Sequence, residues 1–313
     1  MNNTISYYYH LYPETIIKRK KKYIFEYHQV YYIFEPITRP LNEMEEILRL
    51  NEYSSFYNSS IGLIEKNIEG KYITILNNKY YVLISNRTPN RRIYFSDLLV
   101  VKDFIPLNNF MLLKRNDWVN LWSKKNDYFE YQKEYIKTKF PILYYSLDYY
   151  IGLSENAISY IGQVEREMKP SERDHLVLAK KRVHYNDNLH EFQSPLNIVI
   201  DYKERDVSEY FKSLFLDDCY NEEEIINYLK ELPASGFGMG LLMGRMLFPS
   251  FYFDLYEKIV NDVIPEKEIY KIIDKSDDYE YFLRFIYFEI NKIIKIPRID
   301  WLHKDVVYKK EAS

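Results

Sequence analysis

The sequence predicts an α+β protein with a small β-rich part that contains one helix, followed by a larger, mainly helical part. Residues 23–29 and 30–37 are runs of β-branched and aromatic side chains, which is typical of strands. Apolar residues at helical spacing follow in residues 41–53. Asn77-Asn78 separates two more β-prone runs, and asparagine tolerates the positive φ of a hairpin turn. We therefore expect strands, one helix and a hairpin in residues 1–105.

The remainder of the chain is predicted to be helical. Trp118 and Trp122 lie four residues apart and therefore share one helix face. A single strand over residues 197–201 interrupts the helical patterns. The expected helical segments are 110–140, 147–167, 207–216, 222–232, 240–263 and 279–294. We place the boundary between the two parts after residue 105, so that the larger part spans 106–313.

Composition narrows the class of protein. Apolar residues make up 47% of 313 residues, which is a globular composition, and the net charge of −3 argues against a dedicated nucleic-acid binder. No 18-residue uncharged apolar stretch and no N-terminal secretion signal occur, so we expect a cytoplasmic protein without membrane partners. The single cysteine, Cys219, excludes an internal disulfide and is expected to be a small core residue.

The most informative segment is residues 197–211. Its β-branched run ends in Asp201, and Asp206 then begins a helix-period segment. Kinase-like phosphotransferases hold magnesium at an acid in this position, so Asp201 is the candidate metal ligand. The alternative is local capping and pairing, in which Asp206 caps the helix and Glu209 completes a capping-box pattern.

Several segments carry a family resemblance. The chain resembles the endospore coat-associated, kinase-like proteins of the CotS/YutH type, distant relatives of aminoglycoside phosphotransferases. The resemblance lies in residues 149–158, 200–210, 244–253 and 296–302, and Val30–Ile37 looks like the third strand of that family. It implies a bilobal protein-kinase-like fold, with residues 1–105 as the N-lobe and 106–313 as the helical C-lobe. It does not imply phosphotransfer, because such relatives often lack parts of the catalytic set.

Phosphoryl transfer requires a phosphate cradle and a cation on the phosphates. The first of the eight glycines is Gly62, so a first hairpin would have no glycine cradle. The third strand has no lysine and carries Glu35 instead. Strand alternation would place Lys18, Lys20 and Lys22 on one face, which makes Lys20 and Lys22 the candidate cofactor-binding residues. A solvated edge strand guarded by lysines is the favoured interpretation of this run.

The reaction also requires a residue that positions the nucleophile. The resemblance places that residue at about Arg182, and an arginine cannot act as a general base near neutrality. His184 and Asp187 offer a displaced alternative, with Asp187 as the candidate catalytic base; the simpler interpretation is a polar turn. One of four catalytic parts, Asp201, is retained.

Two further patterns have structural interpretations. Gly236, Gly240 and Gly244 recur every four residues after a helix rather than a strand, which favours close helix packing over a dinucleotide loop. The three histidines between residues 175 and 190 have spacings that fit no helical metal site.

These observations predict a catalytically degenerate, pseudokinase-like protein that binds a partner or ligand in the cleft between its lobes. No cofactor is expected. If the family resemblance holds, the partners include spore coat proteins, which a tyrosine-rich surface would suit. The alternative is an active aminoglycoside-phosphotransferase-like kinase that uses ATP and Mg²⁺ on an unknown acceptor. A third hypothesis is a regulatory module in a cell that does not sporulate.

Overall fold

A computed structural model describes residues 1–57, 61–88, 90–99 and 106–303. The chain divides into two compact units, each of which is described by itself. The first comprises residues 1–114 and 176–201, and the second comprises residues 115–175 and 202–313. The boundary predicted after residue 105 adjoins residues 100–105, which lie outside the described part of the chain.

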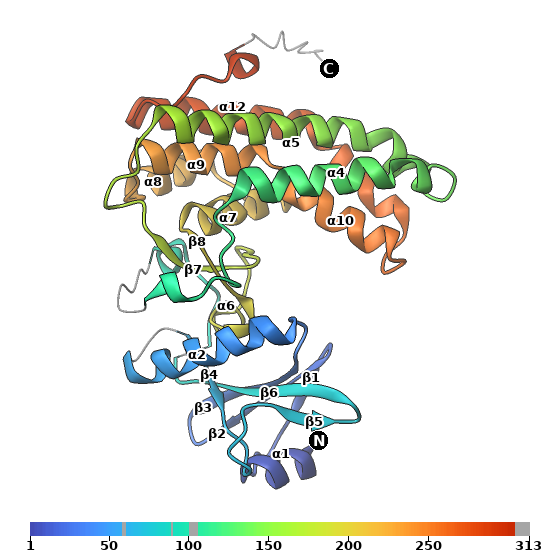
Figure 1. Cartoon of the computed structure of the whole chain (residues 1–313), viewed down its shortest axis with the longest axis vertical. Coiled ribbons are helices and arrows are strands. Elements are labelled where there is room, and N and C mark those ends of the chain that lie inside the picture. Colours follow the sequence, from blue (N-terminus) through green and yellow to red (C-terminus); the bar gives the residue numbers. More distant parts are fainter. Residues whose placement is uncertain (58–60, 89, 100–105, 304–313) are drawn as a thin grey trace. The chain divides into compact units, whose positions relative to one another are not determined.

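The first unit contains an antiparallel sheet in the order β1-β2-β3-β6-β4, with β5 also paired to β6 (Figure 1). The two predicted strands at its start are confirmed, and a tight turn at His28-Gln29 with positive φ at both residues joins them. The hairpin at Asn77-Asn78 is also confirmed, with φ of 48° and 58°. The strands are β1 (Ile17–Arg19), β2 (Lys22–Tyr27), β3 (Val30–Pro36), β4 (Leu63–Glu65), β5 (Thr74–Leu76) and β6 (Lys79–Asn86).

Helices lie on both sides of this sheet (Figure 1). The predicted helix is confirmed as α2 (Leu41–Tyr57), whose Ile47 packs with Ile33 of the sheet in one core cluster. The sequence analysis did not foresee α1 (Asn2–Tyr9), whose Ile5 packs with Phe34 in a second cluster. Shorter elements complete the unit: α3 (Phe95–Leu98), α6 (Leu189–Phe192) and the 3-10 turns Leu107–Asn109 and Pro195–Asn197.

A separate two-stranded sheet in the first unit is formed by β7 (Leu176–Lys180) and β8 (Ile198–Tyr202, whose last residue belongs to the second unit). The strand predicted over residues 197–201 is therefore confirmed. Ile198 and Ile200 join the same apolar cluster as α2. The backbone N–H of Ile200 donates to the carbonyl of Leu113 at 2.8 Å, which fixes the end of β8 within this unit.

The second unit is helical, as predicted. Trp118 and Trp122 stack with ring centroids 5.4 Å apart on one face of α4, which confirms their shared face. The helix predicted over residues 240–263 is wrong, because two helices occupy this range and Pro249, which lacks a backbone N–H, lies between them. The helices are α4 (Trp118–Ile136), α5 (Pro141–Glu167), α7 (Glu204–Leu216), α8 (Glu222–Glu231), α9 (Gly236–Leu247), α10 (Ser250–Val260), α11 (Tyr270–Ile273) and α12 (Ser276–Ile293). The 3-10 turns Glu266–Ile269 and Asp300–His303 also belong to it.

The glycine stripe of α9 packs against α5, as predicted. A Cβ atom at Gly240 would lie 2.9 Å from Val164, and one at Gly244 would lie 2.3 Å from Ile161. Both partners belong to α5. The small residues therefore allow close helix contact, and no dinucleotide loop forms here.

Two smaller predictions are wrong. Cys219 is exposed rather than buried, because it follows the last turn of α7. Asp206 does not cap α7, which begins at Glu204 with Lys203 at the N-cap position and no side-chain cap. Glu209 instead accepts hydrogen bonds from Arg245 and Ser250. Within the described ranges, no helix has both the length and the apolar character needed to cross a bilayer.

Candidate functional site on the inner face of the small sheet

Charged side chains cross β1, β2 and β3 in a row. Arg19 pairs with Lys22, and Tyr23 pairs with Phe34, so Lys22 lies opposite Glu35. Directly opposed residues of antiparallel strands point to the same face. Arg19, Lys22 and Glu35 therefore form a cross-strand row, which we call the charged ladder. It lies on the same face as Ile33, the face that α2 covers.

The centre of the ladder is a close ion pair. Nζ of Lys22 lies 2.9 Å from Oε2 of Glu35, whose side chain is 7% exposed. The hydroxyl of Ser194 donates to Oε1 of Glu35 at 3.1 Å. Both carboxylate oxygens of Glu35 thus have a partner, which is what a buried carboxylate requires.

Residues 187–194 bring further charge to the ladder. A carboxylate oxygen of Glu191 lies 3.9 Å from Nζ of Lys22. Burial raises the pKa of the Asp187 carboxyl, while the nearby Lys22 charge acts in the opposite direction. Two carboxylates, those of Glu35 and Glu191, thus lie within 4 Å of the Lys22 ammonium group and compete with any phosphate for its charge.

Asp187 also has a structural task. Its Oδ2 accepts the backbone N–H of His184 at 2.8 Å, and its own N–H donates to the carbonyl of His184 at 2.9 Å. Its carbonyl accepts the N–H of Ile93 at 3.0 Å. The polar-turn interpretation of this segment is therefore confirmed, and the role of Asp187 as a base stays a prediction.

Lys20 lies at the tip of the β1–β2 turn with φ of 55° and is exposed. The expectation that Lys18, Lys20 and Lys22 share one face is wrong, because the chain reverses at residues 20 and 21 and places Lys18 and Lys22 on different strands. The edge interpretation is confirmed for β1, which is the outermost strand and has all three of its residues exposed. It does not hold for Lys22, which lies in β2 and pairs with Glu35.

Asp201, the candidate metal ligand, lies in β8 and is fully buried. Arg39 supports this strand: its Nε donates to the carbonyl of Leu196 at 2.7 Å and its Nη2 donates to the carbonyl of Ile198. Arg39 also pairs with Glu43 at 3.0 Å. Within the described residues, no group of three or more His, Cys, Asp or Glu side chains is arranged to hold a metal ion.

Arg182 is exposed in the loop after β7. Its backbone N–H donates to Oδ1 of Asn197 at 3.4 Å, and the side-chain amide of Asn197 donates to the carbonyl of Arg182 at 3.1 Å.

His190 packs against β3 of the small sheet. The centroid of its ring lies 4.1 Å from that of Tyr31, and its Nε2 lies 2.7 Å from the carbonyl oxygen of Thr88. Burial lowers the pKa of His190, which favours the neutral ring. The three histidines do not come together as ligands within the described part of the chain.

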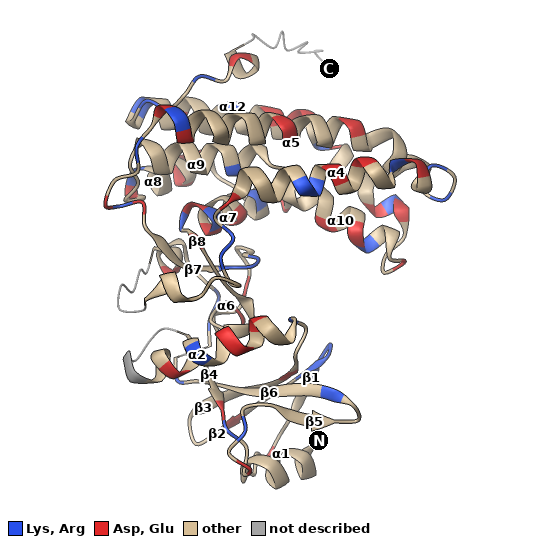
Figure 2. Cartoon of the chain, viewed as in Figure 1, with Lys and Arg blue, Asp and Glu red and all other residues tan. Residues whose placement is uncertain are grey.

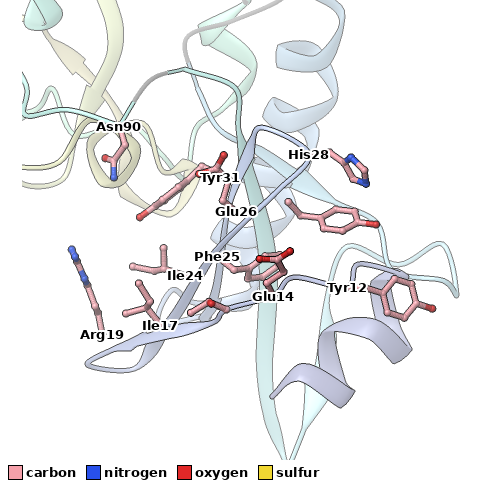
Figure 3. A pocket seen from close by; sticks show the side chains of 12 residues that line it. Tyr12, Glu14, Ile17, Arg19, Ile24, Phe25, Glu26, His28, Tyr31 and Asn90 are labelled. Carbon is pink, nitrogen blue, oxygen red and sulfur yellow. The ribbon is translucent and has the colours of Figure 1, made fainter.

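A cavity of about 610 Å³ adjoins the ladder and shares Arg19 with it. Figure 3 shows Ile17 and Ile24 between Arg19 and Tyr31, with Asn90 beyond them. Glu14 and Glu26 also line the cavity. An apolar floor with a few polar groups is the general form of a small-molecule site.

Sequence reasoning identified Glu35, Lys22 and Asp187 but not their association. It missed Ser194, Glu191 and Arg39. One signal was available: an acid inside a β-branched strand needs a cation when the strand is buried, and the adjacent run of lysines supplies it. Ser194 and Glu191 carry no comparable signal, since they come from a segment more than 150 residues away.

The fold of the chain is similar to that of solved kinase structures. A spectinomycin phosphotransferase bound to AMP matches with a TM-score of 0.54 at 12% identity, covering 91% of this chain and 96% of that one. An amicoumacin kinase matches with a TM-score of 0.47 at 14% identity, covering 93% of this chain and 92% of that one. The first of these shows a kinase-like fold, which confirms the predicted fold class.

The family follows from the sequence. The model of a family described as "Spore coat putative kinase YutH" matches residues 2–286, and the chain belongs to this family. It is similar to the endospore coat-associated protein YutH of Bacillus subtilis (strain 168), with 30% identity over 209 residues. That match covers 60% of this chain and 61% of the relative, so the chain spans less than two thirds of the curated relative it matches.

Proposed function

We propose that this chain is a kinase-fold protein of the spore coat that binds a partner or ligand and does not transfer phosphate. The observation that carries the proposal is the ion pair between Lys22 and Glu35, which lie 2.9 Å apart. To hold a phosphate, Lys22 would have to leave Glu35 buried without its cation. Breaking a buried ion pair on one side costs about 3–5 kcal/mol, and somewhat less here because Lys22 is about one third exposed.

Two other features support the loss of catalysis. The first hairpin, which would cover the phosphates, has Lys20 and Lys21 at its turn and no glycine, so side chains prevent the close approach of backbone amides. Arg182, at the position of the catalytic acid by resemblance, carries a permanent positive charge and cannot accept a proton. These residues fit magnesium and ATP poorly, so no reaction step is assigned to this site.

The alternative is an active kinase with displaced residues. Asp187 would be the base, Asp201 the magnesium ligand, and Lys20 or Lys22 the phosphate cation. Its strongest support is the surviving Asp201 at the end of a buried strand, the position at which such enzymes hold metal. The elevated pKa of Asp187 also fits a general base.

A nucleotide titration separates the two functions. The purified protein is heated with and without millimolar ATP and Mg²⁺, since a ligand that binds only the native state raises the melting temperature. We expect no shift, and no transfer of radiolabelled phosphate to any acceptor tested. A shift that Asp201→Ala abolishes, while Asp127→Ala on an exposed face of α4 does not, would establish the kinase function instead.

The setting in the spore coat rests on the family and on a relative whose name places it with the endospore coat. We propose that coat proteins are the partners, and that the protein is made in the cytoplasm before it reaches the coat. Fractionation of sporulating cells, with the coat extract probed for this chain, tests this setting. Its presence only in the soluble fraction throughout sporulation would favour a regulatory role outside the coat.

A further inference from the structure

The tip of the β1–β2 hairpin carries five consecutive basic residues, Lys18 to Lys22 (Figure 2). Lys22 pairs with Glu35. Among the residues that the structure describes, no acidic side chain forms an ion pair with the other four, although Lys18 lies over the ring of Tyr23 at 5.8 Å. The hairpin therefore presents concentrated positive charge to solvent on a protein whose net charge is −3.

Edge protection explains only part of this charge. A lysine on an edge strand discourages pairing with other chains, and Lys18 on β1 meets that need. Lys20 and Lys21 form the turn and lie on no strand, so they protect no edge. Lys20 is moreover held at φ of 55°, a conformation that lysine rarely adopts.

Within the described part of the chain, no strand covers the outer side of β1. Among the strands that the structure describes, β1 pairs with β2 alone, and Arg19 and Lys22 close a two-residue turn. Residues that flank such a turn exchange hydrogen bonds, so the next residue, Lys18, directs its N–H and C=O away from β2. An extended chain laid along β1 could accept and donate these bonds, as in β-strand addition.

We propose that the outer edge of β1 binds an extended acidic peptide segment of a partner protein. The peptide adds a strand to the sheet through its backbone, and its carboxylates lie against Lys18, Lys20 and Lys21. The same lysines repel basic strands and offer no charge attraction to neutral ones, so they favour acidic ones. This inference deepens the proposed binding role and rests on it.

Other occupants fit less well. A second copy of this chain would bring the same basic strand to the edge, and like charges directly opposed are destabilising. A nucleic acid or an anionic membrane would satisfy the lysines but not the backbone groups of Lys18. Glu14 and Glu26 line the cavity at the other end of β1, so the acids of the peptide belong at the hairpin end.

The probe for this site is a fluorescein-labelled peptide of about eight residues, with threonine and valine alternating in one half and glutamate and valine in the other. Fluorescence anisotropy is measured at low salt without nucleotide, so failure here leaves the ATP result untouched. We expect saturable binding that weakens as salt is added. A peptide with lysine in place of glutamate should not bind.

Charge-reversal variants then test whether binding depends on these lysines or on the positive charge of the protein surface in general. Lys18→Glu, Lys20→Glu and Lys21→Glu together should weaken binding at least about tenfold. The matched control reverses Lys124, Lys230 and Lys258, three exposed lysines of the second unit, and should leave affinity unchanged. Circular dichroism of both triple variants confirms that each one folds.

A backbone-methylated peptide with the same side chains tests strand addition, because it lacks alternate N–H donors. It should bind far more weakly than the parent peptide. The proposal is overturned if the methylated peptide binds as tightly as the parent peptide. It is also overturned if single-stranded DNA or phosphatidylserine vesicles, at matched charge, compete fully with the peptide, because the hairpin would then attract anions in general. An acidic peptide that does not bind at all overturns it as well.

Discussion

The ammonium group of Lys22 and the carboxylate of Glu35 neutralise one another across β2 and β3, with 2.9 Å between Nζ and Oε2. A kinase is expected to have a lysine on the third strand, whereas here the third strand supplies the acid and the preceding strand supplies the cation. It explains how a buried acid is tolerated on a central strand. It also removes one cation from any phosphate that approaches this face.

This pair should contribute to stability. Lys22→Met leaves Glu35 with Ser194 as its remaining partner, and we expect a loss of about 1–3 kcal/mol because Lys22 is partly exposed. Glu35→Gln in the Lys22→Met background removes the uncompensated charge and should recover most of the loss. Urea denaturation of the single and double variants measures the coupling, and strictly additive losses would contradict the pair.

The positive φ of Lys20 in the β1–β2 turn should lower the stability of the chain. Lys20→Gly should stabilise the chain by up to about 1 kcal/mol, because relief of the strain at positive φ, about 1–2 kcal/mol, exceeds the extra entropy that glycine gives the unfolded chain, about 0.5–1 kcal/mol. Lys21→Gly is the matched control, since it removes the same charge but relieves no strain, because Lys21 does not have a positive φ. The melting temperature should rise for the first variant and fall for the second. A fall in both would show that the turn is not strained at Lys20.

Helix packing in the second unit gives a third prediction. Gly244→Ala places a methyl group 2.3 Å from Cδ1 of Ile161, and the overpacking should cost about 1–3 kcal/mol. Gly152→Ala in α5 meets no atom within 4 Å and should gain up to about 1 kcal/mol from helix propensity. Thermal unfolding of both variants checks the contrast. Equal behaviour would mean that α5 and α9 do not pack closely at Gly244.

The buried carboxyl of Asp187 gives a dependence on pH. Burial raises its pKa above the usual 3.8, so the folded state binds this proton more tightly than the unfolded state does. Its contribution to stability is therefore greatest at low pH and declines as pH rises through the raised pKa. Asp187→Asn keeps an acceptor for the His184 N–H but has no carboxyl proton to lose, so the decline should be absent in this variant. Melting temperatures of the parent chain and the variant, measured from pH 4 upward, check this.

Asp174 supplies a control of opposite sign. Burial raises the pKa of its carboxyl, but hydrogen bonds from Ser235 and Ser171 outweigh burial and leave the pKa below 3.8. Its contribution is present above the usual pKa and is lost as pH falls through the lowered one. Asp174→Asn should therefore lose stability at neutral pH relative to the parent chain and approach it in acid. The same pH trend in both variants would contradict these assignments.

Much of the fold could be predicted from the sequence, because the patterns that specify it lie within short stretches of the chain. Asn77-Asn78 specifies a turn by backbone preference, Trp118 and Trp122 share a face by helical period, and the glycine stripe predicts close packing. Pro249 was equally visible, yet the helix predicted across it was wrong since apolar periodicity on both sides concealed the break.

Only part of the candidate site could be predicted from the sequence. The sequence identified Lys22, Glu35, Asp187 and Asp201 as residues of interest, but strand alternation alone misplaced the lysines because it ignored the reversal at Lys20. The roles of Lys20, Lys22, Asp187 and Asp201 in binding or catalysis remain predictions.

The sequence by itself determined the class of fold, the family and the residue types available for chemistry, since these depend on local pattern and motif. Only the tertiary structure decided which charges meet. Glu35 finds Lys22 across a strand pair and Ser194 from a segment 159 residues away, and long-range pairing of this kind follows from chain topology rather than from neighbouring residues.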